Sequence, residues 1–220
     1  MGRQNWRPSN MLYPVPAVLV GCRDEEGRDN LMTAAWAGTI CSDPVMVSVS
    51  IRKERYSHDI IERTGEFTLS LTTEQLAFAA DFCGVRSGRD TDKFRQMELT
   101  PLESVKIKAP GVSESPVVLE CQVRQVLRLG SHDMFIAEVV NVSVDEQYMS
   151  ESGRLMLERA DLIAYSHGEY FSLGEKIGRF GYSVRRTGGS AKPGTAKGKP
   201  APKGVKKRPQ GGKPVKKYKK

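Results

Sequence analysis

The stretch Asn30–Ile51, NLMTAAWAGTICSDPVMVSVSI, carries the clearest structural signals in the chain. Its second half alternates between two kinds of residue: Val45, Val47, Val49 and Ile51 are apolar, and Met46, Ser48 and Ser50 lie between them. A period of two residues is typical of a strand with one buried face. Because Ser42-Asp43-Pro44 is a turn sequence, the whole stretch predicts two strands joined by a tight turn.

Small residues line the predicted strand pair: Thr33, Ala34, Ala35, Ser48 and Ser50. They leave backbone amides unshielded by bulky side chains, which allows the close approach of a flat ligand with polar edges. Small residues also let two sheets pack closely, and spacing alone favours this second interpretation.

Strand signals continue on both sides of this stretch. Further strands are predicted at Pro14–Cys22, Phe67–Leu71, Pro116–Leu129 and Met134–Val144, the last two joined by a turn at Gly130–Asp133. The segment Arg154–Ala164 fits a helix or a strand equally well, and Tyr165–Val184 is rich in aromatic residues and glycine.

Two short helices are predicted between the strands. Ser57 is a candidate N-cap for a helix at His58–Arg63 that ends at Gly65. Thr72 and Gln75 form a capping-box pattern before a helix that runs through Phe82. Because strands dominate, the sequence predicts a mostly β fold and favours a closed barrel over an open sheet.

The basic character of the chain is confined to its end. Residues 187–220 contain twelve Lys and Arg and no acidic residue, which leaves 22 basic against 26 acidic residues in residues 1–186, a net charge of −4. We therefore predict a folded domain at residues 1–186 and a disordered Lys/Gly/Pro-rich tail at 187–220. The tail would bind a polyanion without sequence selectivity, or would only aid solubility.

Several classes of protein are disfavoured. The four cysteines (Cys22, Cys41, Cys83 and Cys121) form no CxxC pair, and the three histidines (His58, His132 and His167) lie far apart, so no metal site is predicted. No apolar run is long enough to span a membrane, and we expect a cytoplasmic protein. Motifs for nucleotide phosphates, zinc proteases and serine hydrolases are absent from the sequence.

Six blocks, in order, carry a resemblance to a known family. They are PVPAVLV from Pro14, NLMTAAW at Asn30–Trp36, DPVMVSVSIRKERYSHDII at Asp43–Ile61, CGVRSGRDTDKF at Cys83–Phe94, GSHDMFIAEV at Gly130–Val139 and YFSLGEKIGRFGYSV at Tyr170–Val184. These blocks resemble the flavin reductase-like, FMN-binding split-barrel proteins, most closely the flavoredoxin branch. The tail has no counterpart in that family.

The resemblance implies a small antiparallel Greek-key split barrel with short helices inserted. It also implies a homodimer with one non-covalently bound FMN per protomer. The residues that would contact FMN are Asn30, Thr33, Ala34, Ala35, Trp36, Ser50, Ile51, Arg52, Ser57, His58, Ser87, Gly88 and Lys93. The first five would lie along the flavin ring, largely through backbone amides, and the others would approach the ring, the ribityl chain and the phosphate.

Each of these residues also has a structural interpretation. Ser57 could serve only as a helix cap, and Trp36 could be a core or interface residue. Lys93, with Arg89, could be a surface charge paired with Asp90 and Asp92.

His132 is the candidate catalytic residue. Many flavin reductases that use NAD(P)H carry Gly-Asp-His at this hairpin, with the histidine near the nicotinamide, whereas this chain has Gly130-Ser131-His132. The alternative is a turn histidine that hydrogen-bonds to the backbone.

Three functions follow from these observations. The first is an FMN-dependent reductase that passes reducing equivalents from NAD(P)H to flavin or another acceptor. The second is an FMN electron carrier of flavoredoxin type that exchanges electrons with a redox protein, which Ser131 favours slightly. The third is a module whose basic tail binds nucleic acid or another polyanion.

Overall fold

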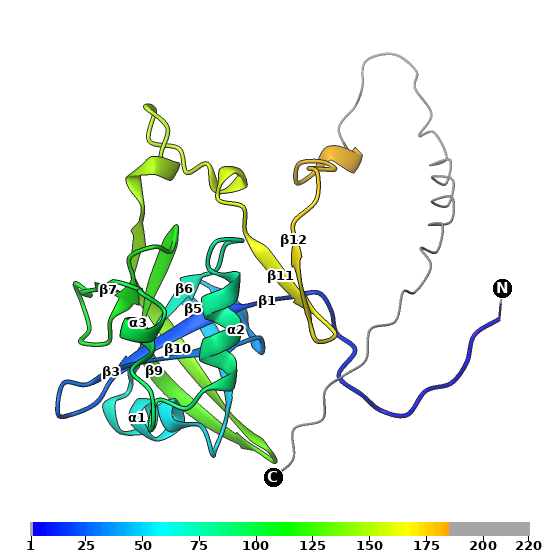
Figure 1. The fold of residues 1–220 in the computed structure, drawn as a ribbon. Coiled ribbons are helices and arrows are strands. Elements are labelled where there is room, and N and C mark those ends of the chain that lie inside the picture. The colour runs from blue at the N-terminus through cyan, green and yellow to red at the C-terminus, as the bar shows by residue number, and fades with distance from the viewer. Residues whose placement is uncertain (1, 185–220) are drawn as a thin grey trace, which may run out of the picture. The chain divides into compact units, whose positions relative to one another are not determined.

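The computed structural model describes residues 2–184, and the predicted basic tail lies outside the described residues. Of the described residues, 2–175 belong to one compact unit (Figure 1). A second unit begins at Lys176, and its described part contains one short 3-10 helix, η3 (Tyr182–Val184). The domain boundary predicted at residue 186 stays a prediction. Within residues 2–184, no helix combines the length and the apolar character that crossing a membrane requires.

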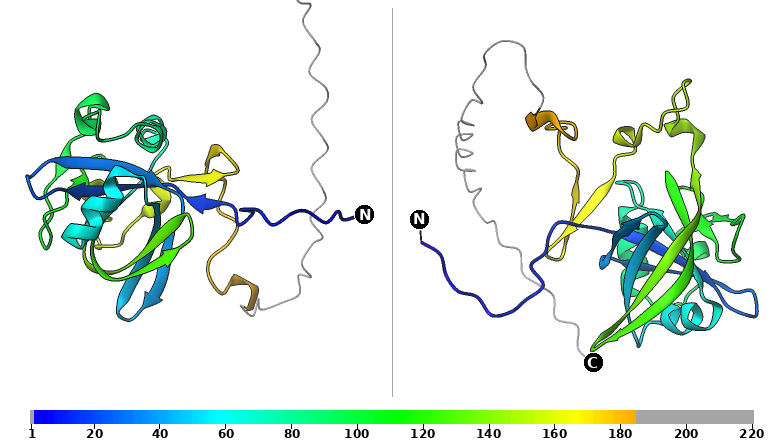
Figure 2. Two further views of the ribbon diagram at one scale, coloured as in Figure 1. Left: turned by 90° about the horizontal axis from the view of Figure 1, so that it is seen from below. Right: turned by 180° about the vertical axis from the view of Figure 1, so that it is seen from behind.

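Seven antiparallel strands form the main sheet, in the order β3-β2-β6-β9-β10-β5-β4. They are β2 (Val18–Arg23), β3 (Asp29–Ala34), β4 (Ala37–Ser42), β5 (Val45–Arg52), β6 (Glu66–Leu71), β9 (Val117–Leu129) and β10 (His132–Val144). Figure 2 shows β9 and β10 as a long twisted hairpin. The predicted mostly β, antiparallel fold is confirmed.

The two edges of this sheet are joined by only two residues. β3 and β4 are the edge strands, yet Ala35 and Trp36 alone separate them in the chain. Three Cα steps reach at most about 11 Å, so the sheet must curl until its edges meet. The Ser50 N–H donates to the Trp36 carbonyl oxygen at 2.8 Å, which continues the β4–β5 pairing into this junction. The sheet is therefore a barrel that closes at Ala35-Trp36.

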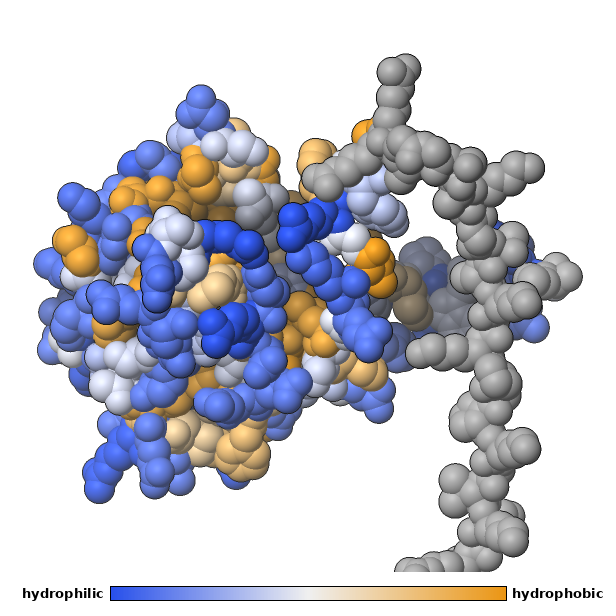
Figure 3. All heavy atoms as spheres, turned by 90° about the horizontal axis from the view of Figure 1, so that it is seen from above, coloured by the Kyte–Doolittle hydropathy of each residue, from blue (hydrophilic) through white to orange (hydrophobic). Residues whose placement is uncertain are grey.

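The barrel interior and one outer face are both apolar. The inner cluster takes alternate residues of the strands, with Phe67 and Phe135 fully buried at its centre. Burying a side chain of this size stabilises the fold by about 1.5–3 kcal/mol. A second cluster lies between β2–β3 and two helices, with Leu19 and Leu31 facing Leu76. β2 and β3 are thus buried on both faces. The surface of the molecule seen in Figure 3 mixes hydrophilic and hydrophobic residues.

Smaller elements complete the fold. β1 (Val15–Pro16), β11 (Ile163–Ser166) and β12 (Glu169–Ser172) form a three-stranded sheet, and β7 (Pro101–Leu102) pairs with β8 (Gly111–Val112). The helices are α1 (Tyr56–Thr64), α2 (Ala77–Val85), α3 (Lys93–Gln96) and the 3-10 helices η1 (Glu146–Tyr148) and η2 (Leu157–Arg159). The ambiguous segment 154–164 therefore contains a 3-10 helix and the start of a strand.

Three strand predictions need correction. The stretch Asn30–Ile51 holds three strands rather than two, because β3 ends before the Ala35-Trp36 junction. The strand predicted at Pro14–Cys22 is divided at Ala17, because β1 pairs with β11 whereas β2 pairs with β3 and β6. β10 begins at His132 instead of Met134, since the connecting turn needs only Gly130-Ser131.

The cap predicted for the first helix is wrong, although its end is as predicted. Arg55 is the N-cap of α1. The Ser57 hydroxyl, inside the first turn, accepts a hydrogen bond from the Asn30 amide instead. Gly65 ends α1 in the left-handed conformation, which confirms that prediction.

The capping box predicted before the second helix is also wrong. α2 begins at Ala77, and its N-cap, Leu76, makes no side-chain hydrogen bond. The Thr72 hydroxyl donates to the Ala17 carbonyl oxygen at 2.7 Å. The hydroxyls of Ser57 and Thr72 therefore form hydrogen bonds with residues that are distant in the sequence, and local sequence patterns do not encode such contacts.

A buried carboxylate holds the loop beside β9. Glu120 accepts hydrogen bonds from the backbone N–H groups of Val105 and Lys106 at 2.9 and 2.7 Å and from the Asn141 amide at 2.8 Å. Burial alone would raise the pKa of Glu120, but these hydrogen bonds hold that pKa below its usual value of 4.5.

We expect Glu120→Gln to lower the free energy of unfolding at neutral pH by about 1–3 kcal/mol, because the glutamine NH₂ group cannot accept a backbone N–H. The pKa of Glu120 is lower in the folded state than in the unfolded state. The stabilisation from its charge is therefore present above the unfolded-state pKa and is lost as the pH falls below about 4.5. Urea denaturation at several pH values measures this, with exposed Glu151→Gln as the control. An equal loss at neutral and acidic pH would contradict the role of the charge.

Candidate functional site

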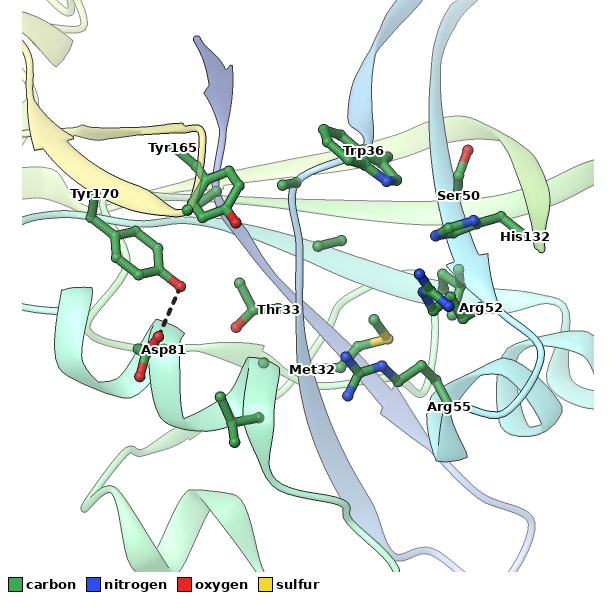
Figure 4. Close-up of a pocket in the computed structure, with 17 residues that line it drawn as sticks. Met32, Thr33, Trp36, Ser50, Arg52, Arg55, Asp81, His132, Tyr165 and Tyr170 are labelled. Atoms are coloured by element: carbon green, nitrogen blue, oxygen red, sulfur yellow. Dashed lines mark hydrogen bonds between the residues drawn. The ribbon is translucent and has the colours of Figure 1, made fainter. Parts of the chain in front are cut away.

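A cavity of about 320 Å³ lies along β3 and the Ala35-Trp36 junction (Figure 4). Its volume falls in the range of small-molecule sites, about 300–1,000 Å³. Eight of the predicted site residues line it: Thr33, Ala34, Ala35, Trp36, Ser50, Ile51, Arg52 and His132. Residues from β3, β5 and the start of β10 thus meet at the point where the barrel closes.

A smaller cavity of about 150 Å³ adjoins the first. Met32, Arg55 and Val85 line both cavities, so the two cavities are adjacent. Four more predicted residues line the smaller one: Asn30, Ser87, Gly88 and Lys93. Ser57 and His58 line neither cavity and are buried behind the site.

β3 offers its backbone to the larger cavity. As an edge strand it pairs only with β2, which leaves one row of backbone polar groups outside the sheet ladder. Small side chains keep this row accessible, and the Thr33 hydroxyl, which donates to the Ala80 carbonyl, ties the strand to α2. A flat ligand with polar edges can therefore approach the backbone of β3 directly.

The contacts beneath the smaller cavity are tight. The Asn30 amide donates to the Ser57 hydroxyl at 2.6 Å. A Cβ atom added at Gly88 would lie 1.9 Å from the Asn30 side-chain oxygen, so only glycine fits there without movement. Ser57 thus supports the site through Asn30.

Lys93 is buried, which excludes its interpretation as a surface charge. Its ammonium group donates to the carbonyl oxygens of Leu31 at 2.5 Å and Cys83 at 2.9 Å. Burial lowers the pKa of Lys93.

Arg89 does not pair with Asp90 or Asp92 either. Its guanidinium lies 3.6 Å from the Asp59 carboxylate and stacks over Tyr56. The Arg89 side chain therefore contacts residues of α1 rather than the acidic residues of its own loop.

Arg55 is the main residue that sequence analysis missed. It stands at the N-cap of α1, where free backbone N–H groups favour an anion, and it lines both cavities. Among the described residues, no carboxylate forms an ion pair with its guanidinium, whereas Arg52 lies 3.4 Å from Glu54. The basic run Arg52-Lys53-Glu54-Arg55 before the helix was the available signal.

His132 faces the larger cavity across from Arg52, its partner in the β5–β10 register (Figure 4). Its Nδ1 atom lies 2.8 Å from the Ser131 hydroxyl oxygen. Burial, followed by the nearby charge of Arg52, lowers the pKa of His132 below 6.5. The imidazole is therefore neutral at physiological pH.

A buried polar network anchors the strand next to His132. Asp133 accepts hydrogen bonds from His58 Nε2 at 2.9 Å and from Arg128, which also contacts Glu62. Burial would raise the pKa of Asp133, but Arg128 and His58 lower it. His58 thus fixes the residue that follows His132 and does not reach the cavity itself.

The remaining wall of the larger cavity is aromatic. Tyr165 of β11 and Tyr170 of β12 line it together with Asp81 of α2. The sequence showed an aromatic-rich segment here but gave no sign that it would fold back onto α2.

Comparison with known proteins agrees with this architecture. The model of the flavin reductase like domain matches residues 10–174. The solved flavoredoxin of Desulfovibrio vulgaris (Miyazaki F) is 32% identical, with a TM-score of 0.78 over 84% of this chain and 100% of that chain. An FMN-binding protein of Thermus thermophilus is 25% identical, with a TM-score of 0.68 over 80% of this chain and 99% of that one. An NADH:riboflavin 5'-phosphate oxidoreductase of Streptomyces pristinaespiralis is 25% identical over 64% of this chain and 78% of that protein.

Proposed function

The chain belongs to the flavin reductase-like family of split-barrel proteins, and we propose that it binds FMN and passes reducing equivalents from NAD(P)H to an acceptor, either a free flavin or a redox protein. The observation that carries this proposal is the site beside β3 that the two adjacent cavities form. It offers an accessible backbone edge at one end and cationic groups at the other.

The residues present fit FMN. The larger cavity would take the flavin ring, with Thr33, Ala34 and Ala35 leaving backbone groups free to meet its polar edge. The smaller cavity would take the phosphate, since Arg55 and the first turn of α1 offer positive charge and N–H donors there. Ser87 and Gly88 would add a hydroxyl and close backbone approach.

FMN supplies the redox chemistry, because it accepts a hydride and releases electrons singly or in pairs. The protein's part is to bind, orient and exclude water. Neutral His132 has one ring nitrogen that donates a hydrogen bond and one that accepts. The Ser131 hydroxyl contacts Nδ1, so Nε2 is free to form a hydrogen bond that orients a second ligand. We propose that this ligand is the nicotinamide carboxamide of NAD(P)H.

The second candidate is an FMN electron carrier reduced by a protein partner. The likeness to flavoredoxin and the Gly130-Ser131-His132 sequence in place of Gly-Asp-His support it. The two candidates share the FMN site and differ in the electron donor.

Two further parts of the proposal concern partners. A hollow of about 500 Å³ shares Ala35, Trp36 and Ser50 with the larger cavity and is also lined by Met11 and Leu12, whose apolar side chains are exposed. We propose that a second copy of the chain covers this region in a homodimer. We also propose that the basic residues of the segment 187–220 contact a polyanion.

Replacing Arg55 with Ala should weaken FMN binding by about 10- to 100-fold, the effect of losing one hydrogen bond between charged groups. Binding of riboflavin, which lacks the phosphate, should be nearly unchanged. Fluorescence titration of the apoprotein with both flavins measures this. Arg95→Ala, which removes an exposed charge from α3, is the control. An equal loss for both flavins would place Arg55 away from the phosphate.

Anaerobic mixing of the FMN-loaded protein with NADH or NADPH separates the two candidate functions. We expect the flavin absorbance to bleach promptly, and His132→Ala to slow bleaching by about 10- to 100-fold, because a misoriented nicotinamide reacts poorly. FMN affinity should stay close to that of the unmodified protein. Absorbance that persists with both nucleotides would favour the electron carrier, and full activity in His132→Ala would remove His132 from the mechanism.

A further inference from the structure

The larger cavity has two walls of opposite character. Figure 4 shows His132, Arg52 and Arg55 on one side of β3, and Tyr165, Tyr170 and Asp81 on the other. The predicted FMN contacts use β3 and the cationic side. The side that contains Asp81 is therefore available to a second ligand.

Two tyrosine rings line this second wall. The ring centroids of Tyr165 and Tyr170 lie 5.4 Å apart in an edge-to-face arrangement, and the ring centroid of Tyr13, which does not line the cavity, lies 6.2 Å from that of Tyr165. The faces of such rings carry negative electrostatic potential and attract planar cations.

Asp81 adds a negative charge to the same wall. The Tyr170 hydroxyl lies 3.5 Å from its carboxylate, and burial together with this carboxylate raises the pKa of Tyr170 to about 12. The hydroxyl therefore remains protonated and directed at Asp81. Within residues 2–184, no lysine, arginine or histidine forms an ion pair with Asp81, so its charge is available to a ligand that enters the cavity.

We propose that the nicotinamide ring binds against Asp81, Tyr165 and Tyr170, and that this binding site favours the cationic, oxidised form of the ring. This inference rests on the proposed function. A carboxylate beside two aromatic rings matches a flat ring of positive charge.

The preference for a cation would also promote the reaction. When a dihydronicotinamide gives up its C4 hydride, that C–H bond breaks, both electrons leave with the hydrogen for the flavin, and the ring is left as a pyridinium. Positive charge therefore develops on the nicotinamide in the transition state. A fixed negative charge on the same wall binds that state more tightly than the neutral reduced ring.

The test compares two fragments that share a carboxamide ring. 1-Methylnicotinamide is a cation, and nicotinamide is neutral. Ligand-observed NMR on the FMN-loaded protein should show tighter binding of the cation, by about three- to tenfold for a partly exposed charge. Asp81→Asn should abolish this preference, whereas Glu74→Gln, which removes an exposed charge just before α2, should retain it.

The tyrosine rings are tested separately. Tyr170→Leu should weaken binding of the cation, and Tyr170→Phe, which keeps the aromatic face, should restore most of it. The rate of flavin reduction by NAD(P)H should fall in Asp81→Asn by about the same three- to tenfold factor, with FMN affinity unchanged.

Two results would overturn the inference alone: equal binding of both fragments by the unmodified protein, or an undiminished cation preference in Asp81→Asn. Failure of the apoprotein to bind FMN would instead refute the proposed function, and the inference with it. Flavin titration before the NMR experiment distinguishes these cases.

Discussion

The connection of two residues between the opposite edges of the sheet is the constraint on which the rest of the structure depends. Because Ala35 and Trp36 must carry the chain from β3 to β4, the barrel closes at this point, and the Trp36–Ser50 hydrogen bond fixes the closure. The same junction leaves one backbone edge of β3 outside the ladder. The cavity therefore arises from the way in which the barrel closes.

The charges around the cavity are held by contacts behind it. Lys93 ties β3 to the end of α2 through two carbonyl oxygens, and Asp133, bonded to His58 and Arg128, fixes the start of β10. Buried polar groups of this kind are costly unless they are paired, so each pairing favours a single arrangement of the strands. The cation Arg55 and the exposed anion Asp81 are thus presented on a rigid frame.

Sequence reasoning succeeded where the signal was local. The alternation through Val47, Val49 and Ile51 predicted the buried face of β5. It failed where side chains serve distant segments: the Ser57 hydroxyl bonds Asn30 instead of capping α1, and the aromatic hairpin reaches α2 only through the fold. Arg55 was missed because the basic run before α1 does not distinguish it from its neighbours Arg52 and Lys53.

The central claim is that the flavin ring lies on the free backbone edge of β3. Amide hydrogen exchange of the protein with and without FMN tests it most directly, because a ligand on this edge protects the N–H groups that it covers. We predict slower exchange at residues 33–36 on FMN binding, with smaller changes in the β9–β10 strands, which are already paired. FMN binding that leaves residues 33–36 unchanged and protects another part of the chain would contradict this assignment.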